Sequence, residues 1–311
     1  MYAIALSDFG GPEVLEVRDI PIPEPGLGQL RVRVRASTVA KIDISTRNGA
    51  ISRGGLLAPH EDIGLGWDVA GTVDAVGAGV RRFAVGDDVI GLRDLLFVFP
   101  GAHAEYVVLH EGAVAHAPSG TPHEQAATVP LGGLTADRAL ALAGLAARPD
   151  AARHRAAGGV GGFVLELARL RGLRTIAVAS PADEALVGEL GATDFVARTD
   201  ALGEAVRNLV PGGVDAVIDT AVVGIVAHEA LRGGGTFVAL VAPFAPPPIR
   251  GTKVVVQEVY ADGGRLAELS ALVEAGRLTL RVAQTIPLVE AAKAHQLVES
   301  GGQRGRIVLQ A

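Results

Sequence analysis

A glycine-rich stretch, AAGGVGG at residues 156–162, has the composition of a phosphate-binding turn. A turn of small residues that leads into a helix lets backbone N–H groups approach a pyrophosphate, and the helix dipole favours its negative charge. We expect Ala157, Gly158, Gly159 and Val160 to line such a turn. Taken alone the stretch is weak evidence, because a chain with 41 glycines contains many ordinary turns.

The strand expected after this helix ends in AVAS at residues 177–180, about 20 residues beyond the glycines, where a dinucleotide ribose is normally read. A cofactor that lacks a 2′-phosphate is usually held there by an acidic residue, but this strand end offers only the hydroxyl of Ser180. Arg198, just after the next expected strand, is a candidate donor to a 2′-phosphate, with the alternative that it is a solvated surface cation. The pattern favours the phosphorylated cofactor.

The elements that would position these residues follow two patterns. Residues 1–119 are rich in short strands and glycine turns, among them QLRVRVRAS at 29–37, where valine and arginine alternate as in a half-buried strand. From residue 120 helices alternate with apolar strands, which predicts a parallel, doubly wound sheet. The last segment, 280–311, returns to strand, helix and strand. The predicted fold class is therefore α/β, with one domain formed by 1–119 and 280–311 and another by 120–279.

Composition narrows the possible partners. With a net charge of −6 and no run of Lys or Arg, the chain offers no electrostatic basis for binding nucleic acid or an anionic membrane. It contains no cysteine, which excludes disulfides and thiolate ligands and suits a reducing compartment. The N-terminus shows no signal-peptide pattern, and no apolar stretch is long enough for a membrane-spanning helix. These features predict a cytoplasmic protein that acts on small molecules.

Several segments, in order along the chain, resemble the medium-chain dehydrogenase/reductase superfamily and, within it, the zinc-independent quinone oxidoreductase-like branch. They are GLGWDVAGTVDAVGAGVRRFAVGDDV, GAHAEYVVL, AATVPLGGLTADRAL, AAGGVGG, ELGATDFV, VDAVIDT and the terminal GQRGRIVL. The resemblance implies a GroES-like β domain with an inserted Rossmann domain, and NADPH as the cofactor. It also implies hydride transfer to a quinone or an activated alkene such as a 2-enone, and a homodimer.

The same resemblance implies roles for single residues of the cofactor site. Thr135 matches a position beside the nicotinamide, while Asp219 and Thr220 match the end of a Rossmann strand beneath the cofactor. Leu240, at the end of GTFVAL, is placed with them. Thr135 has the alternative of capping a helix, and Asp219 that of hydrogen-bonding a neighbouring turn.

The catalytic groups are less well matched. In zinc-dependent relatives a Cys and a His of the catalytic site fall where this chain has Ala40 and Trp67, so we expect no zinc. Quinone reductase relatives often place an Asn at the position of Ala40 and a Tyr where this chain reads AISR, so no proton donor is identified. Asp43 and Lys41 are the candidates for polarising a carbonyl oxygen, with a structural role as the alternative for Asp43.

One segment conflicts with the expected fold. The central parallel strand should precede the glycine turn, but residues 148–155 read RPDAARHR, where the family reads much like GDTLLVTG. If GC-rich codons are chosen for these eight residues and read one base later, they spell Gly-Pro-Thr-Leu-Leu-Val-Thr-Gly. We infer a local, self-correcting frameshift, either in the reading of the gene or in the gene itself. The alternative is a displaced segment with weakened cofactor binding.

Two classes of function follow from these observations. The first is an NADPH-dependent oxidoreductase for quinones or 2-enones, supported by the glycine turn and the ordered set of motifs. The second is a cofactor-binding or scaffold protein with little or no turnover, supported by the unusual segment 148–155 and the missing Asn and Tyr. Fold alone does not decide between them, because function depends on the site.

Overall fold

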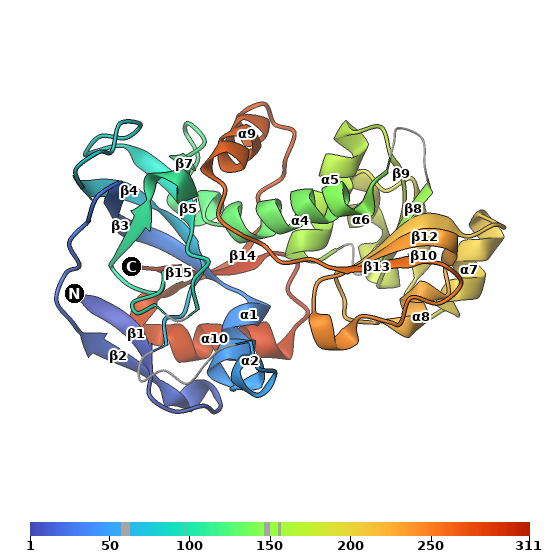
Figure 1. Cartoon of the computed structure of the whole chain (residues 1–311), viewed down its shortest axis with the longest axis horizontal. Helices are drawn as coiled ribbons and strands as arrows, with labels where there is room; N and C mark the ends of the chain where they lie inside the picture. Colours follow the sequence, from blue (N-terminus) through green and yellow to red (C-terminus); the bar gives the residue numbers. More distant parts are fainter. Residues whose placement is uncertain (57–62, 97, 146–149, 155–156) are drawn as a thin grey trace. The chain divides into compact units, whose positions relative to one another are not determined.

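The chain, of which we have a computed structural model, divides into two compact units (Figure 1). Unit 1 comprises Met1–Leu134, Tyr260–Gly276 and Leu280–Ala311, and unit 2 comprises Thr135–Val259 and Arg277–Thr279. The structure describes all residues except 57–62, 97, 146–149, 155 and 156, and for 150–154 it describes the backbone.

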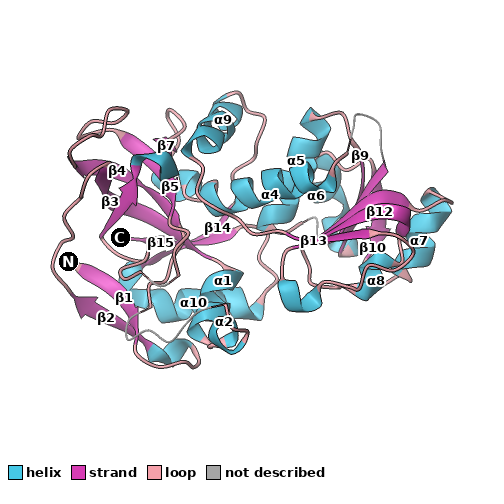
Figure 2. Cartoon of the chain, viewed as in Figure 1, coloured by secondary structure: helices cyan, strands magenta, loops and turns pink. Residues whose placement is uncertain are grey.

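Unit 1 is built mainly from strands, with helices at its edges (Figure 2). Its strands are β1 (Tyr2–Leu6), β2 (Leu15–Asp19), β3 (Gln29–Val39), β4 (Asp68–Val76), β5 (Asp88–Leu92), β6 (Tyr106–His110), β7 (Val114–His116), β14 (Val282–Pro287) and β15 (Arg306–Gln310). Its helices are α1 (Lys41–Arg47), α2 (Ala50–Arg53), α3 (His123–Ala126), α9 (Gly263–Glu274) and α10 (Ala291–Ser300), together with the first residues of α4 (Pro130–Ala143).

The main sheet of unit 1 has the order β14-β15-β3-β4-β5-β7, and β6 also pairs with β3. The pairs are antiparallel except for β14 with β15. Along β3 the side chains of Leu30, Val32 and Val34 are buried, whereas Arg33 and Arg35 are exposed. The alternation in the sequence therefore correctly predicted a half-buried strand, because successive side chains of a strand point to opposite faces.

Unit 2 alternates strands and helices. Its strands are β8 (Asp150–His154), β9 (Arg174–Ala179), β10 (Asp194–Ala197), β11 (Val214–Asp219), β12 (Leu231–Ala239) and β13 (Lys253–Val256). Its helices are α5 (Gly159–Leu170), α6 (Glu184–Glu189), α7 (Leu202–Leu209) and α8 (Ile225–His228). Short 3-10 helices occur at Pro12–Val14, Glu111–Ala113, Pro181–Asp183, Ala242–Phe244 and Leu288–Glu290.

The six strands of unit 2 form a parallel sheet in the order β10-β9-β8-β11-β12-β13. Counted within the unit this is the order 3-2-1-4-5-6 of a Rossmann sheet, so the strand order reverses between β8 and β11. The predicted α/β class with a doubly wound parallel sheet is confirmed.

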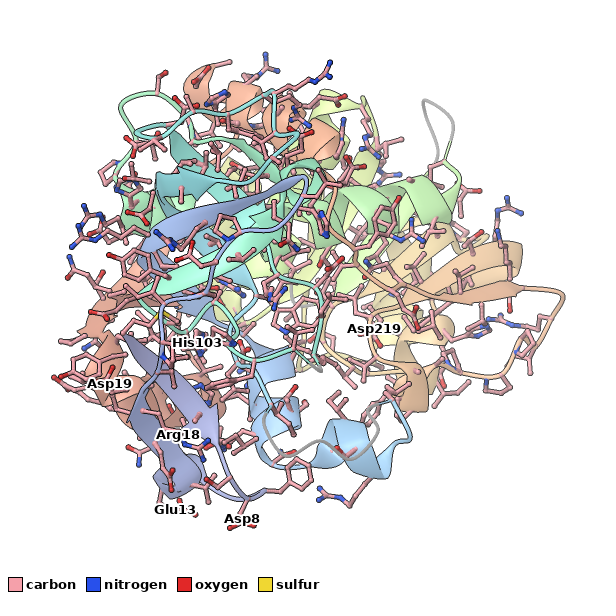
Figure 3. All side chains as sticks on the ribbon, turned by 60° about the vertical axis from the view of Figure 1, so that its left-hand side comes forward. Asp8, Glu13, Arg18, Asp19, His103 and Asp219 are labelled. Atoms are coloured by element: carbon pink, nitrogen blue, oxygen red, sulfur yellow. The ribbon has the colours of Figure 1, made fainter. Side chains whose placement is uncertain are left out.

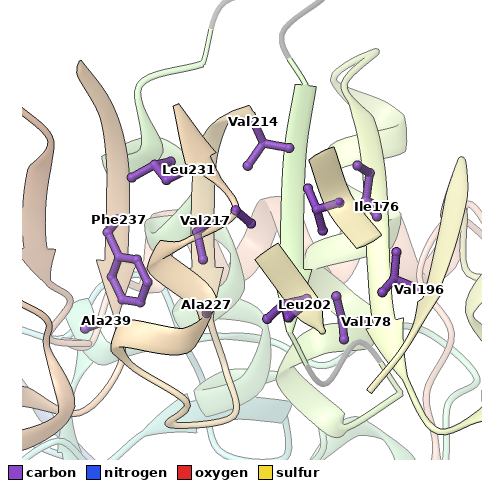
Figure 4. Close-up of a cluster of buried hydrophobic side chains, with 12 residues drawn as sticks. Ile176, Val178, Val196, Leu202, Val214, Val217, Ala227, Leu231, Phe237 and Ala239 are labelled. Carbon is purple, nitrogen blue, oxygen red and sulfur yellow. The ribbon is translucent and has the colours of Figure 1, made fainter. Parts of the chain in front are cut away.

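Both faces of this sheet are covered by apolar side chains. On one face, Ile176 and Val178 of β9 and Val217 of β11 pack with Leu202 and Val206 of α7 (Figure 4). On the opposite face, the buried side chains of Leu165 in α5, Val187 in α6 and Leu190 just after α6 pack with Ala177 and Ala179 of β9. A strand at the centre of this sheet is therefore enclosed on both sides, and such strands are normally apolar throughout.

The segment that looked unsuited to a strand forms the centre of this sheet. Residues 150–154 make β8, which pairs with 174–178 of β9 and 216–219 of β11. The backbone is therefore not displaced, since β9 and β11 both need a partner for their N–H and C=O groups. The proposed frameshift concerns side chains that lie outside the described part of the chain, so it stays a prediction.

The first division between the two units falls inside a helix, between Leu134 and Thr135 of α4. The reason is that α3 and the start of α4 contact the strands of unit 1, where the Leu131 N–H donates to a carboxylate oxygen of Asp68 (2.6 Å). Within the described residues, none of the helices has the length and apolar character needed to cross a bilayer.

Candidate functional site

In unit 2 the glycine turn lies at the carboxyl end of the central strand. β8 ends at His154, Gly158 is extended (φ −73°, ψ 172°), and α5 begins at Gly159. The Gly162 N–H donates to the Gly158 carbonyl (2.9 Å), and no acidic residue stands in the first turn of α5. The helix N-terminus thus presents its partial positive charge beside the point where the strand order reverses. This arrangement fits a pyrophosphate.

The two residues proposed to read the ribose lie next to each other. Ser180 follows β9 and is half-buried, while Arg198 follows β10 and is exposed. The Arg198 N–H donates to the Ala179 carbonyl (2.8 Å), so the two strand ends are joined by a hydrogen bond. The guanidinium of Arg198 therefore starts from a position beside Ser180, as contact with a common 2′-phosphate requires.

Asp219 is buried at the end of β11 and organises the loop that follows (Figure 3). Its carboxylate accepts N–H groups from Ala221 (3.0 Å), Val223 (2.8 Å) and Gly224 (2.7 Å). The Asp219 carboxylate therefore accepts three backbone N–H groups of the turn that follows it. This is the alternative role, hydrogen bonding to a neighbouring turn, that the sequence left open. Within this loop Val222 adopts a left-handed conformation (φ 63°), which costs about 1 kcal/mol or more for a β-branched residue.

The remaining predicted cofactor residues are placed at three elements. Thr220 and Leu240 directly follow β11 and β12, and both are half-buried. Thr135 is buried inside α4, which begins at Pro130. The alternative that Thr135 caps this helix is therefore wrong, because a cap must stand at the first turn.

Unit 2 also contains a residue that the sequence analysis did not single out. Gln257 follows β13, its N–H donates to the Ala239 carbonyl (2.8 Å), and its side chain is only 5% exposed. Its Nε2 is buried and has no hydrogen-bond partner among the described residues. A buried amide is normally satisfied, so Gln257 is a further candidate for contact with a bound group.

In unit 1 the two candidate catalytic residues are engaged in structural contacts. The Asp43 carboxylate is fully buried and accepts N–H groups from Ala40 (2.7 Å) and Gly66 (2.8 Å). Burial raises the pKa of Asp43, while His103 and these two hydrogen bonds lower it. Lys41 is exposed, and its ammonium donates to the Val298 carbonyl near the end of α10 (2.8 Å). The geometry favours the structural alternative for Asp43 and gives Lys41 a structural contact as well.

His103 is buried in unit 1, whereas Asp8, Glu13 and Asp19, in and between β1 and β2, are exposed (Figure 3). Its ring packs edge-on against that of His295 in α10, with 5.8 Å between centroids. Both nitrogens of His295 lack a hydrogen-bond partner in the described structure, and the side chain is fully buried. Burial, helped by His103 and Arg47, lowers the pKa of His295 to about 2.

A polar network links three strands beside these residues. Asp68, at the start of β4, accepts hydrogen bonds from the Thr38 hydroxyl and from Arg306 (2.7 Å), which begins β15. Its second oxygen receives the N–H of Leu131. The network fixes the β3, β4 and β15 ends and the start of α4 around one carboxylate.

The two residues that the resemblance matches to zinc-ligand positions, Ala40 and Trp67, lie at this same end of the sheet. Ala40 follows β3 and Trp67 precedes β4, and the two strands run antiparallel. Arg93, which the sequence analysis did not single out, follows β5 at the same end and donates its N–H to the Trp67 carbonyl (2.7 Å). Among the described residues, no group of three His, Cys, Asp or Glu side chains is arranged to hold a metal ion.

The known proteins and family models similar to this chain are described as dehydrogenases or oxidoreductases. The family model described as "Alcohol dehydrogenase GroES-like domain" matches residues 26–119, and that described as "Zinc-binding dehydrogenase" matches 190–309. A quinone oxidoreductase of Pseudomonas aeruginosa is 33% identical, over 98% of this chain and 98% of its own. The NADPH-dependent alkenal/one oxidoreductase of Arabidopsis thaliana chloroplasts is 29% identical, over 99% of this chain and 79% of its own. The crystal structure of an NAD-dependent alcohol dehydrogenase superposes with a TM-score of 0.87, at 32% identity and with 100% of both chains covered.

Proposed function

We propose that this chain, which belongs to the zinc-independent quinone oxidoreductase-like branch of the medium-chain dehydrogenase/reductase superfamily, transfers a hydride from NADPH to a quinone or an activated alkene. The observation that carries the proposal is the start of α5 at the carboxyl end of the central strand, where the order of a Rossmann sheet reverses. The names of the quinone oxidoreductase and alkenal/one oxidoreductase relatives support the two acceptor classes.

The cofactor would be held by backbone more than by side chains. Residues 157–160 at the start of α5 would bind the pyrophosphate, and Ser180 with Arg198 would bind the 2′-phosphate. Thr135, Thr220 and Leu240 complete the proposed contact set. Asp219 would act indirectly, because it fixes the conformation of the loop that contains Thr220. When bound, the nicotinamide supplies the hydride.

Little acid catalysis is required of the protein. A quinone or enone that accepts a hydride develops negative charge on its oxygen, which a single donor or a water proton neutralises. Asp43 has both oxygens occupied by backbone N–H groups, and the Lys41 ammonium is bonded to a helix carbonyl. We therefore propose that solvent provides the proton and that the chain contributes orientation and exclusion of water.

The test combines cofactor binding with turnover. NADPH binding is followed by fluorescence, and NADPH oxidation is measured with a panel of quinones and 2-enones. Gly159→Asp places a carboxylate at the start of α5, where it should weaken NADPH binding by at least tenfold. Gly188→Asp, at an exposed position with open space, is the matched control and should leave binding unchanged. Tight binding without oxidation of any acceptor would instead support the cofactor-binding protein without turnover.

We also propose a homodimer that uses the edge strand β13. This strand pairs only with β12, and Val256 is 38% exposed. Ile249 and Phe244, which precede it, are likewise exposed. An apolar edge strand is a template for pairing with another chain, and self-complementary pairing would close a two-fold dimer. Light scattering should show a dimer that Val256→Lys dissociates, whereas Val17→Lys on the exposed face of β2 should not.

A cytoplasmic location is likewise a proposal. Its support is the absence of cysteine from the sequence, which suits a reducing compartment. Fractionation of cells with marker proteins for cytoplasm, membrane and secreted material tests it directly.

A further inference from the structure

Arg93 extends the pairing of β4 and β5 by one residue. Asp68 of β4 stands opposite Leu92 of β5, and the next pair is Trp67 with Arg93. The hydrogen bond from the Arg93 N–H to the Trp67 carbonyl (2.7 Å) continues the ladder. Residues directly opposite each other in an antiparallel pair share one face, so the side chains of Arg93 and Trp67 leave the sheet on the same side.

Among the described residues, the guanidinium of Arg93 has no ion-pair partner. Its Nε is buried without a hydrogen-bond partner, and its Nη2 makes only a long contact of 3.4 Å to the Pro100 carbonyl. No carboxylate within the described residues forms an ion pair with it. Burial lowers the pKa of Arg93, but an arginine remains protonated at neutral pH. A positive charge is thus partly withdrawn from water without an ion-pair partner in the described part of the chain, which is unfavourable.

Other shielded arginines of unit 1 differ from Arg93 in having an ion-pair partner, although Arg47 and Arg306 also each keep one buried nitrogen without a hydrogen-bond partner among the described residues. Arg31 pairs with Asp74 (2.6 Å), Arg47 with Glu299, and Arg306 with Asp68. Arg93 has an acidic neighbour in the sequence, Asp94, but this carboxylate accepts the N–H of Ala261 (2.7 Å). Asp94 therefore raises the pKa of Arg93 only through space. The Asp94 carboxylate thus compensates part of the charge of Arg93 through space but forms no ion pair with its guanidinium.

The position of Arg93 in the fold indicates which kind of anion would pair with its guanidinium. Ala40, Trp67 and Arg93 all lie at one end of the strands β3, β4 and β5, and the family resemblance implies that the first two match positions of catalytic zinc ligands. The proposed phosphate contacts of the cofactor come from unit 2, through α5 and Arg198. An anion for Arg93 is therefore best supplied by the acceptor.

We propose that Arg93 binds a carboxylate of the acceptor, so that the preferred substrates are activated alkenes that carry a carboxylate. This inference rests on the proposed oxidoreductase function. A guanidinium forms a bidentate, charge-assisted hydrogen-bonded pair with a carboxylate. Because arginine is always positively charged, a carboxylate that is always ionised at neutral pH compensates its charge. In the reaction the hydride and its two electrons pass from NADPH to the alkene carbon β to the ketone. Water gives a proton to the α carbon, and NADP⁺ and the saturated keto acid are released.

Acetylacrylate and its methyl ester provide a matched pair of acceptors, because they share the alkene and ketone and differ in charge. The wild-type protein should have the higher kcat/KM for acetylacrylate. Arg93→Gln should lower this value roughly 10- to 100-fold, mainly through KM, and change the value for the ester less than about threefold. Arg93→Lys should retain part of the preference. Arg81→Gln, at an exposed arginine of the same unit, is the control and should change neither value.

Other outcomes separate the possibilities. If Arg93→Gln lowers kcat equally for acetylacrylate and its ester, Arg93 acts on the developing enolate oxygen and the proposal is overturned. Unchanged kcat/KM for both acceptors would also overturn it. The thermal unfolding temperature of Arg93→Gln should be no lower than that of the parent, and its NADPH affinity should match, which excludes misfolding. Levulinate, the product, should inhibit the parent more strongly than methyl levulinate does, and this difference should vanish in Arg93→Gln. Failure of NADPH oxidation with every acceptor would count against the proposed function, whereas reduction of neutral acceptors without a carboxylate preference contradicts only the inference about Arg93.

Discussion

Arg306 donates to the Asp68 carboxylate at 2.7 Å, although the two residues are 238 positions apart in the sequence. The side chain of Asp68 is completely buried and that of Arg306 is 14% exposed. The same carboxylate accepts the Thr38 hydroxyl and the N–H of Leu131. This pair joins the last strand of the chain to β4 and to the start of α4 in unit 1.

Asp68→Asn should destabilise the protein strongly. The amide keeps the shape of the side chain but removes the charge that compensates Arg306, and loss of one partner from a buried pair costs about 3 kcal/mol or more. Urea unfolding measures the change. Asp215→Asn breaks the more exposed pair with Arg232 and should change the unfolding free energy by less than about 1 kcal/mol. Equal effects of the two substitutions would contradict the importance of the Asp68 network.

His295 should make the protein less stable in mild acid. Its pKa is about 2 in the folded chain, against 6.5 for an ordinary histidine, so below pH 6.5 the unfolded state takes up a proton that the folded state excludes. The stabilising contribution is complete above pH 6.5 and falls as the pH drops toward 2. Between pH 6.5 and 5 the loss is about 2 kcal/mol.

His295→Leu should therefore reduce the dependence of unfolding free energy on pH over this range. Asp43 acts in the opposite direction, because its raised pKa means that the folded state binds a proton more readily than the unfolded state. The comparison of variant with parent removes that contribution. His110→Leu, at an exposed histidine, is the control and should leave the pH dependence unchanged. Parallel pH profiles for His295→Leu and the parent would refute the prediction.

Arg198→Ala should weaken NADPH binding and leave NADH binding unaffected. Ser180 and Arg198 stand at adjacent strand ends without an acidic residue at 177–180, so Arg198 is the cation proposed to contact the 2′-phosphate. Since Arg198 is exposed, the expected loss is about fivefold. Arg232→Ala, in β12 three strands from β9 in the same sheet, serves as the control. Comparable affinities of the parent for NADPH and NADH in a titration would contradict a 2′-phosphate site.

The sequence identified the fold better than the site. Alternation of Val and Arg defined β3, and the βα alternation after residue 120 defined the parallel sheet, because burial of one face or both leaves a periodic pattern. Arg93 leaves no such pattern. Its neighbour Trp67 is 26 positions away, and only the register of β4 with β5 brings the two together.

The sequence also left two alternative roles open for each of Asp43 and Asp219. A carboxylate that polarises a substrate and one that accepts backbone N–H groups are the same residue type, and the difference lies in burial and in the donors around them. Both carboxylates are buried and bonded to backbone N–H groups. The expected domain limits at 119 and 280 stay a prediction. Composition carries no signal for the contacts that α3 makes with the strands of unit 1.

Elemental analysis should find no stoichiometric zinc in the chelator-washed, untagged protein. The reason is chemical: Ala40 and Trp67 offer no zinc-binding atom, and the sequence contains no cysteine. One family model that matches the chain is nevertheless described as a zinc-binding dehydrogenase, so the measurement is informative. One equivalent of zinc per chain would show that other residues form a site.

The last prediction concerns β8. Its backbone lies between β9 and β11, with Arg153 in register with Ala177 and Ile218, in a sheet covered on both faces. Such positions are normally apolar, because an unpaired charge there costs several kcal/mol out of a total stability of roughly 5–15 kcal/mol. We therefore expect the physical protein to contain a strand of the Thr-Leu-Leu-Val-Thr type, produced by a reading one base later. Tryptic mapping should then give one long peptide from Ala139 to Arg169, since no basic residue would lie between Arg138 and Arg169. Cleavage after Arg153 and Arg155, in a protein that binds NADPH tightly, would show that the frameshift hypothesis is wrong.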